Sequence, residues 1–357
     1  MKKSQPQLYF RPTILEMDPY IPGEQPSTAN VIKLNTNENP YLPAPLVFKA
    51  LQQYSKERMR LYPPSQPIKL IQRLSRIYHW PMDGILVGNG SDEILSMIFQ
   101  AVLEKGRSVQ FPNLTYSLYP VLASLNNAEI KKVYLDNNFE LLFNQCSLKS
   151  HLTIWGNPNP PIGNCFSTED MKKFCRQTQG LVVIDEAYVD FSNASVIAWA
   201  RQFPNVLILR TLSKSFSLAS IRLGFVLGNA SVIHQLLKVK NSYNVSDLTQ
   251  TLGMAALQPS SLTYVKKTIQ NICSERVRLT EQLRNQGFDV PASQANFVLA
   301  FHPQAQLVYN ELKKNNIFVR YFPYDRLKNA IRITIGSPNQ NHQLLKACQE
   351  ILKISKK

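Results

Sequence analysis

The chain has 357 residues, of which 44% are hydrophobic and 18% are charged. These fractions are typical of a folded protein with a substantial core, and they exclude a disordered or low-complexity chain. The 40 Lys and Arg residues outnumber the 24 Asp and Glu residues and give a net charge of +16, which keeps a nucleic-acid-binding function open until the site chemistry is considered.

The predicted elements begin after a segment over residues 1–30 that is rich in Pro, Asn and Gln, in which PGEQPST at 22–28 predicts a loop. Apolar residues at helical spacing predict helices over 46–59 and 68–80. Short apolar runs bounded by turn residues predict strands over 85–88, 152–156, 181–185, 205–210 and 221–228. Because these runs are apolar at successive positions, we expect a mostly parallel central sheet covered by helices on both faces.

The last third of the chain has a different pattern. A long helix is predicted over 261–289, and strands over 295–301, 316–322 and 330–336 alternate with helical stretches, which indicates a smaller α+β unit. The sequence therefore predicts an α/β fold with a large domain over 45–255. The N-terminal arm, residues 1–44, and residues 256–357 are expected to form a small domain.

Membrane, secreted and metal-binding proteins are not expected. No apolar run approaches the roughly 18 residues that cross a bilayer, and the start MKKSQPQLYFRP has no apolar signal segment. The five cysteines and five histidines are dispersed, without CxxC, HExxH or HxH spacing. We expect a soluble cytoplasmic protein that has no disulfide scaffold and no structural metal.

Candidate functional residues directly follow the predicted strands, because open α/β sheets bind ligands beyond the carboxyl ends of their strands. The turn NGSDE follows the run that ends at Gly88 and leads into a helix. The free backbone N–H groups of Ser91 and Asp92 could bind a phosphate there. An ordinary helix cap at Ser91 explains the same residues equally simply.

A carboxylate, a phenol and an amide follow two other strands. Asp185 ends the run LVVID, where it needs a cationic or hydrogen-bonding partner. A metal, the protonated ring nitrogen of a cofactor, or solvent around a loop would each satisfy it. Tyr188 could reach the same ligand. Asn157, in the turn WGNPNPPIG, could donate to a ligand oxygen or serve only the turn.

The stretch LRTLSKSFSLASIRLGF contains a lysine between two predicted strands. Lys214 lies among the hydroxyls of Thr211, Ser213 and Ser215, eight residues before Arg222. A lysine in such a place can form a Schiff base, and the hydroxyls with the arginine could bind a phosphate. The alternative is an exposed lysine in a surface loop.

Together and in this order, these motifs resemble the fold-type I pyridoxal-phosphate-dependent aminotransferases, and more narrowly the histidinol-phosphate aminotransferase family. The segments that carry the resemblance are KLNTNENPYLPAP (33–45), RLYPPSQP (60–67), VGNGSDE (87–93), FPNLTYSLY (111–119), NPNPPIG (157–163), VVIDEAYVDF (182–191), LRTLSKSFSLASIRLGF (209–225), ANFVL (295–299), FVRYF (318–322) and IRITIG (331–336). The lysine motif is specific for the superfamily, whereas NENPY, YPPSQP and IRITIG favour the narrower family.

The resemblance implies roles around the ring of pyridoxal phosphate. Lys214 would hold the cofactor covalently and later move a proton. Asp185 would pair with the ring nitrogen and keep it protonated. Tyr188 and Asn157 would hydrogen-bond the phenolic oxygen, and Tyr116 would stack on the ring.

The resemblance also implies a phosphate site shared between subunits. The backbone N–H groups of Ser91 and Asp92, together with Ser213 and Arg222, would surround the cofactor phosphate. Tyr62 matches the residue that reaches this phosphate from the neighbouring subunit, so a homodimer is implied.

Substrate recognition is implied at four further positions. Arg332 matches the arginine that binds the substrate carboxylate. Arg320 and Tyr20 match positions used for a phosphate end, although Arg320 is also explained as a surface residue at a strand edge. Asn37 lies in a segment that lines the entrance.

Two segments depart from the family pattern. The family's Asn-Pro-Asn-Asn-Pro-Thr-Gly appears here as NPNPPIG, with Pro160 and Ile162 in place of polar residues. Asn157 is retained, so its cofactor role is still expected. In the lysine loop, serines stand where Ala and Gly are more usual: Ser215, Ser217 and Ser220.

The implied reaction is transamination of L-histidinol phosphate with 2-oxoglutarate, giving imidazole-acetol phosphate and glutamate in histidine biosynthesis. An aromatic amino-acid aminotransferase and a threonine-phosphate decarboxylase are the related alternatives. A basic nucleic-acid-binding protein is the remote one, because basic residues never run longer than two in sequence and no helix-turn-helix or RNA-binding motif is present. Neither a nucleic acid nor a membrane is therefore an expected partner.

Overall fold

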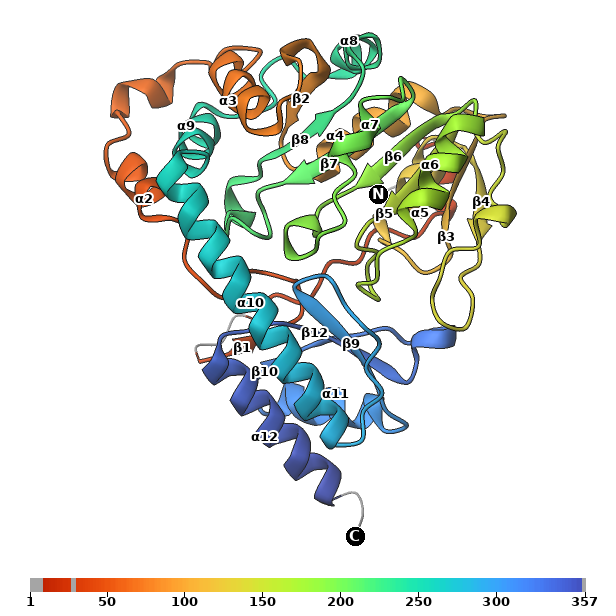
Figure 1. Cartoon of the computed structure of the whole chain (residues 1–357), viewed down its shortest axis with the longest axis vertical. Coiled ribbons are helices and arrows are strands. Elements are labelled where there is room, and N and C mark those ends of the chain that lie inside the picture. Colours follow the sequence, from red (N-terminus) through yellow and green to blue (C-terminus); the bar gives the residue numbers. More distant parts are fainter. Residues whose placement is uncertain (1–8, 27–29, 355–357) are drawn as a thin grey trace, which may run out of the picture.

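A computed structural model describes residues 9–26 and 30–354, and within them a seven-stranded sheet forms the centre (Figure 1). Its strand order is β2-β8-β7-β6-β5-β3-β4. The strands are β2 (Ile85–Gly88), β3 (Ser108–Pro112), β4 (Glu129–Val133), β5 (Leu152–Gly156), β6 (Leu181–Asp185), β7 (Val206–Thr211) and β8 (Gly224–Leu227). Strands β3 to β7 pair in parallel, which confirms the predicted mostly parallel sheet.

Strand β8 is the exception, because it pairs antiparallel with both β2 and β7. Only residues 212–223 separate it from β7, and they hold no more than the short 3₁₀ helix η6 (Ala219–Ile221). A parallel neighbour usually requires a crossover that contains an α-helix, whereas this connection contains only a short 3₁₀ helix and turns back. The turn carries Lys214 and Arg222, so the antiparallel return brings both close to the sheet edge.

Helices cover both faces of the sheet. The first face is covered by α4 (Ser91–Val102), α5 (Leu118–Leu125) and α8 (Ala230–Val239). The second is covered by α3 (Ile68–Tyr78), α6 (Thr168–Gln177), α7 (Ile197–Ala200) and α9 (Asp247–Ala256). Neighbouring strand residues alternate between the faces: Ile154 packs in the first layer and Trp155 in the second. Both layers are apolar, which explains strands without polar alternation.

A smaller unit follows along the chain. Its antiparallel sheet has the order β11-β12-β9, formed by β9 (Phe297–Phe301), β11 (Arg320–Tyr321) and β12 (Ala330–Thr334). Its helices are α10 (Pro259–Asn285), α11 (Ala305–Lys314) and α12 (Pro338–Ile354), of which α10 extends from the large part into the small one (Figure 1). A separate core cluster, including Ile272, Ile331 and Leu344, joins these elements. The domain boundaries at residues 44 and 255 stay a prediction.

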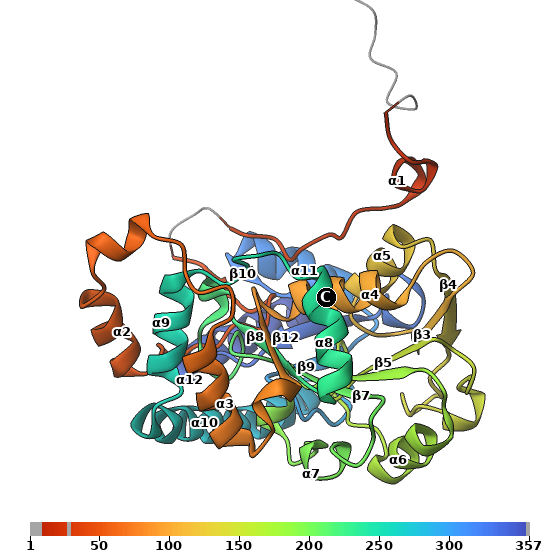
Figure 2. The ribbon, with the colours of Figure 1, turned by 90° about the horizontal axis from the view of Figure 1, so that it is seen from above.

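The N-terminal arm runs between the two parts. Its strand β1 (Ile32–Lys33) pairs in parallel with β10 (Ile317–Phe318) of the small unit. Further upstream, α1 (Pro12–Glu16) projects from the body beside α5 (Figure 2), where the Arg11 guanidinium donates to the carbonyl of Leu125. Residues 22–26 form neither helix nor strand, as predicted for the loop over 22–28, whose last two residues lie outside the described chain.

One helix is shorter than predicted. The pattern over 46–59 forms α2 (Pro45–Gln52) and, after a break, the 3₁₀ helix η2 (Lys56–Arg60). The break lets Tyr54 and Arg58 both bind the Asp247 carboxylate at the start of α9, each at 2.7 Å. The other 3₁₀ helices are η3 (Met82–Gly84), η4 (Phe143–Gln145), η5 (Val189–Phe191) and η7 (Asp325–Leu327).

Within residues 9–26 and 30–354, no helix has the length and apolarity that a membrane crossing requires. The same residues contain no group of three or more His, Cys, Asp or Glu side chains that could hold a metal ion.

Candidate active site

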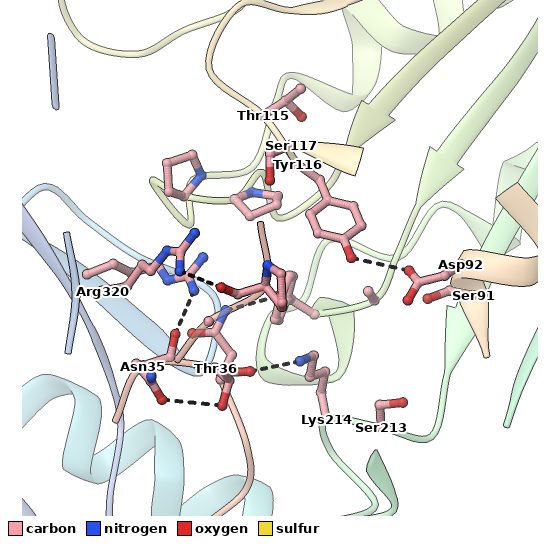
Figure 3. Close-up of a pocket in the computed structure, with 18 of the residues that line it drawn as sticks. Asn35, Thr36, Ser91, Asp92, Thr115, Tyr116, Ser117, Ser213, Lys214 and Arg320 are labelled. Carbon is pink, nitrogen blue, oxygen red and sulfur yellow. Dashed lines mark hydrogen bonds between the residues drawn. The ribbon is translucent and has the colours of Figure 1, made fainter. Parts of the chain in front are cut away.

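A cavity of about 230 Å³ lies at the carboxyl ends of the parallel strands. Its walls come from the N-terminal arm, the start of α4, the loops that follow β3, β5, β6 and β7, and the small-unit strands β11 and β12. Figure 3 shows Lys214, Asp92, Tyr116 and Arg320 approaching the cavity from different sides. A concave site at this edge of an α/β sheet is where such folds bind their ligands.

Asp185 lines the cavity at the end of β6 and is only 7% exposed. Its burial away from water raises its pKa to about 6, although two hydrogen bonds favour the charged form. They come from the Tyr119 hydroxyl at 2.8 Å and the Ala187 backbone N–H at 3.0 Å. Burial also raises the pKa of Tyr119, which therefore keeps its proton and donates. A carboxylate held in this way is suited to a cationic ligand group.

Lys214 lines the same cavity, and its Nζ donates to the Thr36 carbonyl at 3.2 Å (Figure 3). The same Nζ lies 5.7 Å from the ring centroid of Tyr188. The Asn39 amide donates to the backbone carbonyls of both Lys214 and Ser215 at 3.1 Å. The NTNEN segment of the arm thus fixes the backbone and the amine of this lysine.

A buried ion pair supports the lysine loop from behind. The Arg210 guanidinium lies 2.8 Å from the Glu186 carboxylate and 3.0 Å from that of Asp190. The Ser215 hydroxyl, next to Lys214, donates to the same Asp190 carboxylate. One of the serines that departs from the family pattern therefore links the lysine loop to the charge cluster under β6 and β7.

Tyr188 is oriented by the arm and by the small unit. Its hydroxyl accepts a hydrogen bond of 2.9 Å from the Asn37 amide. Its ring lies edge-on to Phe297 at 5.1 Å between centroids. Asn37 itself is 2% exposed and bonds to Thr334 of β12. The structure places Asn37 inside the cavity wall, beside Tyr188, rather than at an open entrance.

The start of α4 forms an anion cradle. Gly90 caps the helix with φ of +84°, and a Cβ there would lie 2.5 Å from the Arg222 guanidinium. The backbone N–H groups at Ser91 and Asp92 have no partner within the first turn of the helix. Arg222 lies 3.5 Å from the Ser213 hydroxyl and 3.2 Å from the Asp92 carboxylate. The positive end of the helix dipole, the Ser213 hydroxyl and the Arg222 guanidinium therefore lie close together, as a phosphate site requires.

Two arginines from neighbouring strands line the far wall. Arg320 of β11 and Arg332 of β12 are direct partners in the antiparallel register. Arg332 donates to the Asn35 carbonyl at 3.0 Å, but its buried Nε has no partner among residues 9–26 and 30–354. Burial, together with the Arg320 charge, lowers the pKa of Arg332. This guanidinium is therefore poised for an anionic ligand.

Aromatic rings form the remaining wall. Tyr116 and Tyr20 meet edge-on, with centroids 5.9 Å apart, and both line the cavity. Burial raises the pKa of Tyr116, and its hydroxyl donates to the Asp92 carboxylate at 3.3 Å. Arg320 holds the segment next to Tyr20 by donating to the carbonyls of Ile21 and Pro22 at 3.1 and 3.0 Å.

The sequence profile of one family, described as aminotransferase class I and II, matches residues 29–348. The chain belongs to this family. It is 38% identical to histidinol-phosphate aminotransferase 1 of Trichormus variabilis over 97% of this chain and 99% of that protein. It is 40% identical to the histidinol-phosphate aminotransferase of Rippkaea orientalis over 96% and 99% of the respective lengths.

Solved structures of such enzymes share the fold. Histidinol-phosphate aminotransferase from Sinorhizobium meliloti, in complex with pyridoxal-5'-phosphate, superposes with a TM-score of 0.90 at 23% identity, covering 97% of this chain and 98% of that one. A mutant aspartate aminotransferase of Thermus thermophilus gives 0.80 at 16% identity over 96% and 99%. The expected α/β aminotransferase architecture is confirmed.

Two expected residues of this aminotransferase do not line the cavity. Asn157 is fully buried, its amide oxygen accepts from the Phe166 N–H at 2.9 Å, and its amide nitrogen faces the Ala194 carbonyl at 3.4 Å. Its position therefore does not support the expected bond to a cofactor oxygen. Tyr62 is 82% exposed and stacks on Tyr243 outside the cavity. The other expected residues line it: Tyr20, Asn37, Ser91, Asp92, Tyr116, Asp185, Tyr188, Ser213, Lys214, Arg222, Arg320 and Arg332.

Other residues of the aminotransferase site were not predicted. Tyr119 follows Tyr116 by three residues on the same segment, and that spacing is the one signal that could have indicated it. Asn39 lies in the NENPY motif, but its contact with Lys214 spans 175 residues of sequence. No local pattern gives such a contact.

Proposed function

We propose that this aminotransferase transfers the amino group of L-histidinol phosphate to 2-oxoglutarate with pyridoxal phosphate as its cofactor. The pair Arg320 and Arg332 carries this proposal. The cavity that Lys214 lines also contains two guanidinium groups from paired strand positions, in addition to the cradle at α4. A cofactor phosphate, a substrate phosphate and the carboxylates of glutamate require separate cationic receptors.

The described residues fit pyridoxal phosphate. Asp185, buried under the cavity, offers a carboxylate to a protonated ring nitrogen. The cradle beside Gly90 leaves open a space that a Cβ would fill against Arg222. Arg332 has a buried Nε without a partner in the described chain, as expected for a receptor of a substrate anion. The donor set thus matches the two ends of the cofactor and one end of the substrate.

When bound, pyridoxal phosphate supplies a carbonyl for the amino group and a ring that accepts electrons as the substrate Cα–H bond breaks. Lys214 would anchor this group, would take the proton from the Cα of the amino donor, and in the second half of the reaction would supply a proton to the Cα of the new amino acid. Asp185 would keep a positive charge on the ring nitrogen. Arg332 would bind the carboxylate of glutamate, and Arg320 with Tyr20 would bind the phosphate end of histidinol phosphate.

We further propose a homodimer in the cytoplasm. Tyr62 and Tyr243 form a stacked pair whose rings are 82% and 49% exposed, and Tyr62 matches the residue that reaches the neighbouring subunit's phosphate. The five cysteines are free thiols, which suits a reducing compartment.

The substrate is tested by comparing kcat/KM for histidinol phosphate, phenylalanine and threonine phosphate, with 2-oxoglutarate as acceptor. We expect histidinol phosphate to exceed phenylalanine by about 100-fold or more, because its doubly charged phosphate would interact with Arg320 and Tyr20, and phenylalanine has no group that replaces this phosphate. Comparable values for phenylalanine would make the chain an aromatic amino-acid aminotransferase. Release of carbon dioxide from threonine phosphate without amino transfer would make it a decarboxylase.

The role of Lys214 is tested with Lys214→Ala. We expect the rate to fall by roughly 10³-fold or more and the covalent cofactor absorbance near the visible range to disappear. Lys173→Ala, which removes an exposed lysine on α6, is the matched control and should keep both. Turnover by Lys214→Ala at the unaltered rate would refute the proposal.

A further inference from the structure

The family motif that normally contributes an asparagine to this site presents prolines instead. Pro158, Pro160 and Pro161 line the cavity, and Pro160 stands where the family pattern has an asparagine. None of the three can donate a hydrogen bond. The remaining asparagines of the motif bond elsewhere: Asn157 as described above, and Asn159 to Leu114 and Thr115. This wall therefore offers no amide to a ligand oxygen.

Asn37 provides an amide next to the same tyrosine from another part of the chain. Its backbone N–H donates to the Thr334 hydroxyl at 3.0 Å, and that hydroxyl donates back to the amide oxygen of Asn37 at 3.3 Å. With its oxygen turned to Thr334, the amide nitrogen faces Tyr188 and donates to its hydroxyl at 2.9 Å. The Asn296 amide also holds the Asn37 carbonyl at 3.0 Å.

We propose that Asn37 is a positioning residue for Tyr188, which makes the tyrosine hydroxyl donate its proton into the cavity, toward the phenolic oxygen of the cofactor. A hydroxyl that accepts from Asn37 must direct its own O–H elsewhere. Asn37 thus strengthens one donor where Pro160 removes another. This inference rests on the proposed cofactor chemistry, and it gives Asn37 a different role from the substrate contact that the sequence predicts.

The backbone at position 37 suits this role. Asn37 has φ of +57°, in the left-handed region that asparagine tolerates better than other residues with a side chain. Glycine adopts the same backbone without strain, so Asn37→Gly removes the amide and keeps the chain path. Asn316 has the same φ of +57° and does not line the cavity, so Asn316→Gly is a matched control.

The test is a pH titration of the cofactor absorbance in the loaded, resting full-length protein, which reports the pKa of the nitrogen that joins Lys214 to the cofactor. When the nitrogen loses its proton, the negative charge of the phenolic oxygen is no longer balanced by the positive nitrogen. A hydrogen bond donated to this oxygen stabilises that state and so lowers the pKa of the nitrogen. We expect Asn37→Gly to raise this pKa by about one unit. Asn316→Gly should leave it unchanged. In a Tyr188→Phe background, Asn37→Gly should add little further shift.

A second variant covers poor folding of the first. Asn37→Asp keeps size and backbone tolerance, but its carboxylate cannot donate and instead accepts the Tyr188 proton. We expect it to raise the same pKa more in the native background than with Tyr188→Phe. Equal shifts in both backgrounds, or none in either variant, would overturn the inference. Failure of the unaltered chain to acquire cofactor absorbance would instead refute the proposed function.

Discussion

At the scale of single residues, the site depends on charged groups that are partly or largely withdrawn from water. Burial disfavours the charged form of both Asp185 and Arg332, but the two side chains differ in their hydrogen-bond partners. Asp185 receives two hydrogen bonds, from Tyr119 and Ala187, whereas Arg332 keeps a buried Nε that has no partner in the part of the chain that the structure describes. The first arrangement fixes a carboxylate for a permanent cationic partner. The second leaves a cation ready for an anion that comes and goes.

Asp185 gives a prediction for the cofactor-free protein. Its pKa rises from 3.8 to about 6 on folding because of burial, so the folded chain holds a proton that the unfolded chain has released over this pH range. Raising the pH from 4 to 7 should therefore lower the free energy of unfolding by about 2 kcal/mol relative to Asp185→Asn, which cannot titrate. Urea unfolding at several pH values measures the difference.

The half-buried Asp170 on α6 lies outside the cavity and is the control for this experiment, because Asp170→Asn should keep the pH dependence of the unaltered chain. Parallel pH dependence of the unaltered chain and Asp185→Asn would contradict the prediction. Adding the cofactor should reduce the difference, since a cationic ring nitrogen would offset the burial of the carboxylate.

The sequence predicts some of these residues better than others. Asp185 and Lys214 directly follow strands, so their place at the sheet edge is predicted by the strand pattern alone. Asn157 follows a strand as well, yet the buried turn after β5 turns its amide toward Phe166. The turn's own hydrogen bonds decide this, and they are not visible in the motif. Asn37 and Tyr188 are 151 residues apart in sequence, so their contact could be found only in the folded structure.

At the scale of elements, the start of α4 determines how the phosphate site is built. Gly90 has φ of +84° and borders the Arg222 guanidinium, so the backbone can approach a ligand where any side chain would stand between them. We expect Gly90→Ala to weaken cofactor binding by at least about tenfold, through both the clash and the left-handed backbone. Titration of the cofactor-free protein, followed by fluorescence, measures the affinity.

Gly106→Ala is a control for left-handed strain away from the cavity. Gly106 has φ of +89°, and an added Cβ there would meet no atom of the described residues within 4 Å, so this variant carries the backbone strain without a clash and outside the site. It should lose stability and keep its cofactor affinity. Equal affinities for both variants would mean that the cradle at α4 does not hold the cofactor.

The sequence predicts strands well where both faces of the sheet are buried, and it predicts less well the features that depend on how elements pair. The five apolar runs are strands because both faces of the sheet are covered. The direction of β8 follows from a connection to β7 that contains only the short helix η6 and no crossover α-helix, which the apolar pattern of the strands does not encode. The helix over 46–59 breaks after Gln52, and contacts with Asp247 hold the following residues.

At the scale of the whole molecule, the arm and the two parts form one site, and the proposed homodimer would involve an exposed aromatic pair outside this site. Tyr62 and Tyr243 stack with centroids 4.6 Å apart and an angle of 22° between their planes. An exposed aromatic pair of this kind is typical of an interface. Of the basic residues behind the net charge of +16, Arg222, Arg320 and Arg332 line the cavity. Basic residues never run longer than two in sequence, so the sequence does not favour a polyanionic partner.

A shared site can be tested with mixed subunits. If Tyr62 acts in the neighbouring site, Tyr62→Ala and Lys214→Ala homodimers should both be strongly impaired, whereas unfolding and refolding them together should restore activity. Random pairing makes about half of the dimers hybrids, and each hybrid has one site with both residues intact, so about a quarter of the native activity should return. Mixing Lys214→Ala with Asp185→Asn is the control: both residues serve the same site, so neither site of the hybrid is complete. No recovery with Tyr62→Ala, despite hybrid formation on native gels, would place Tyr62 outside the neighbouring site.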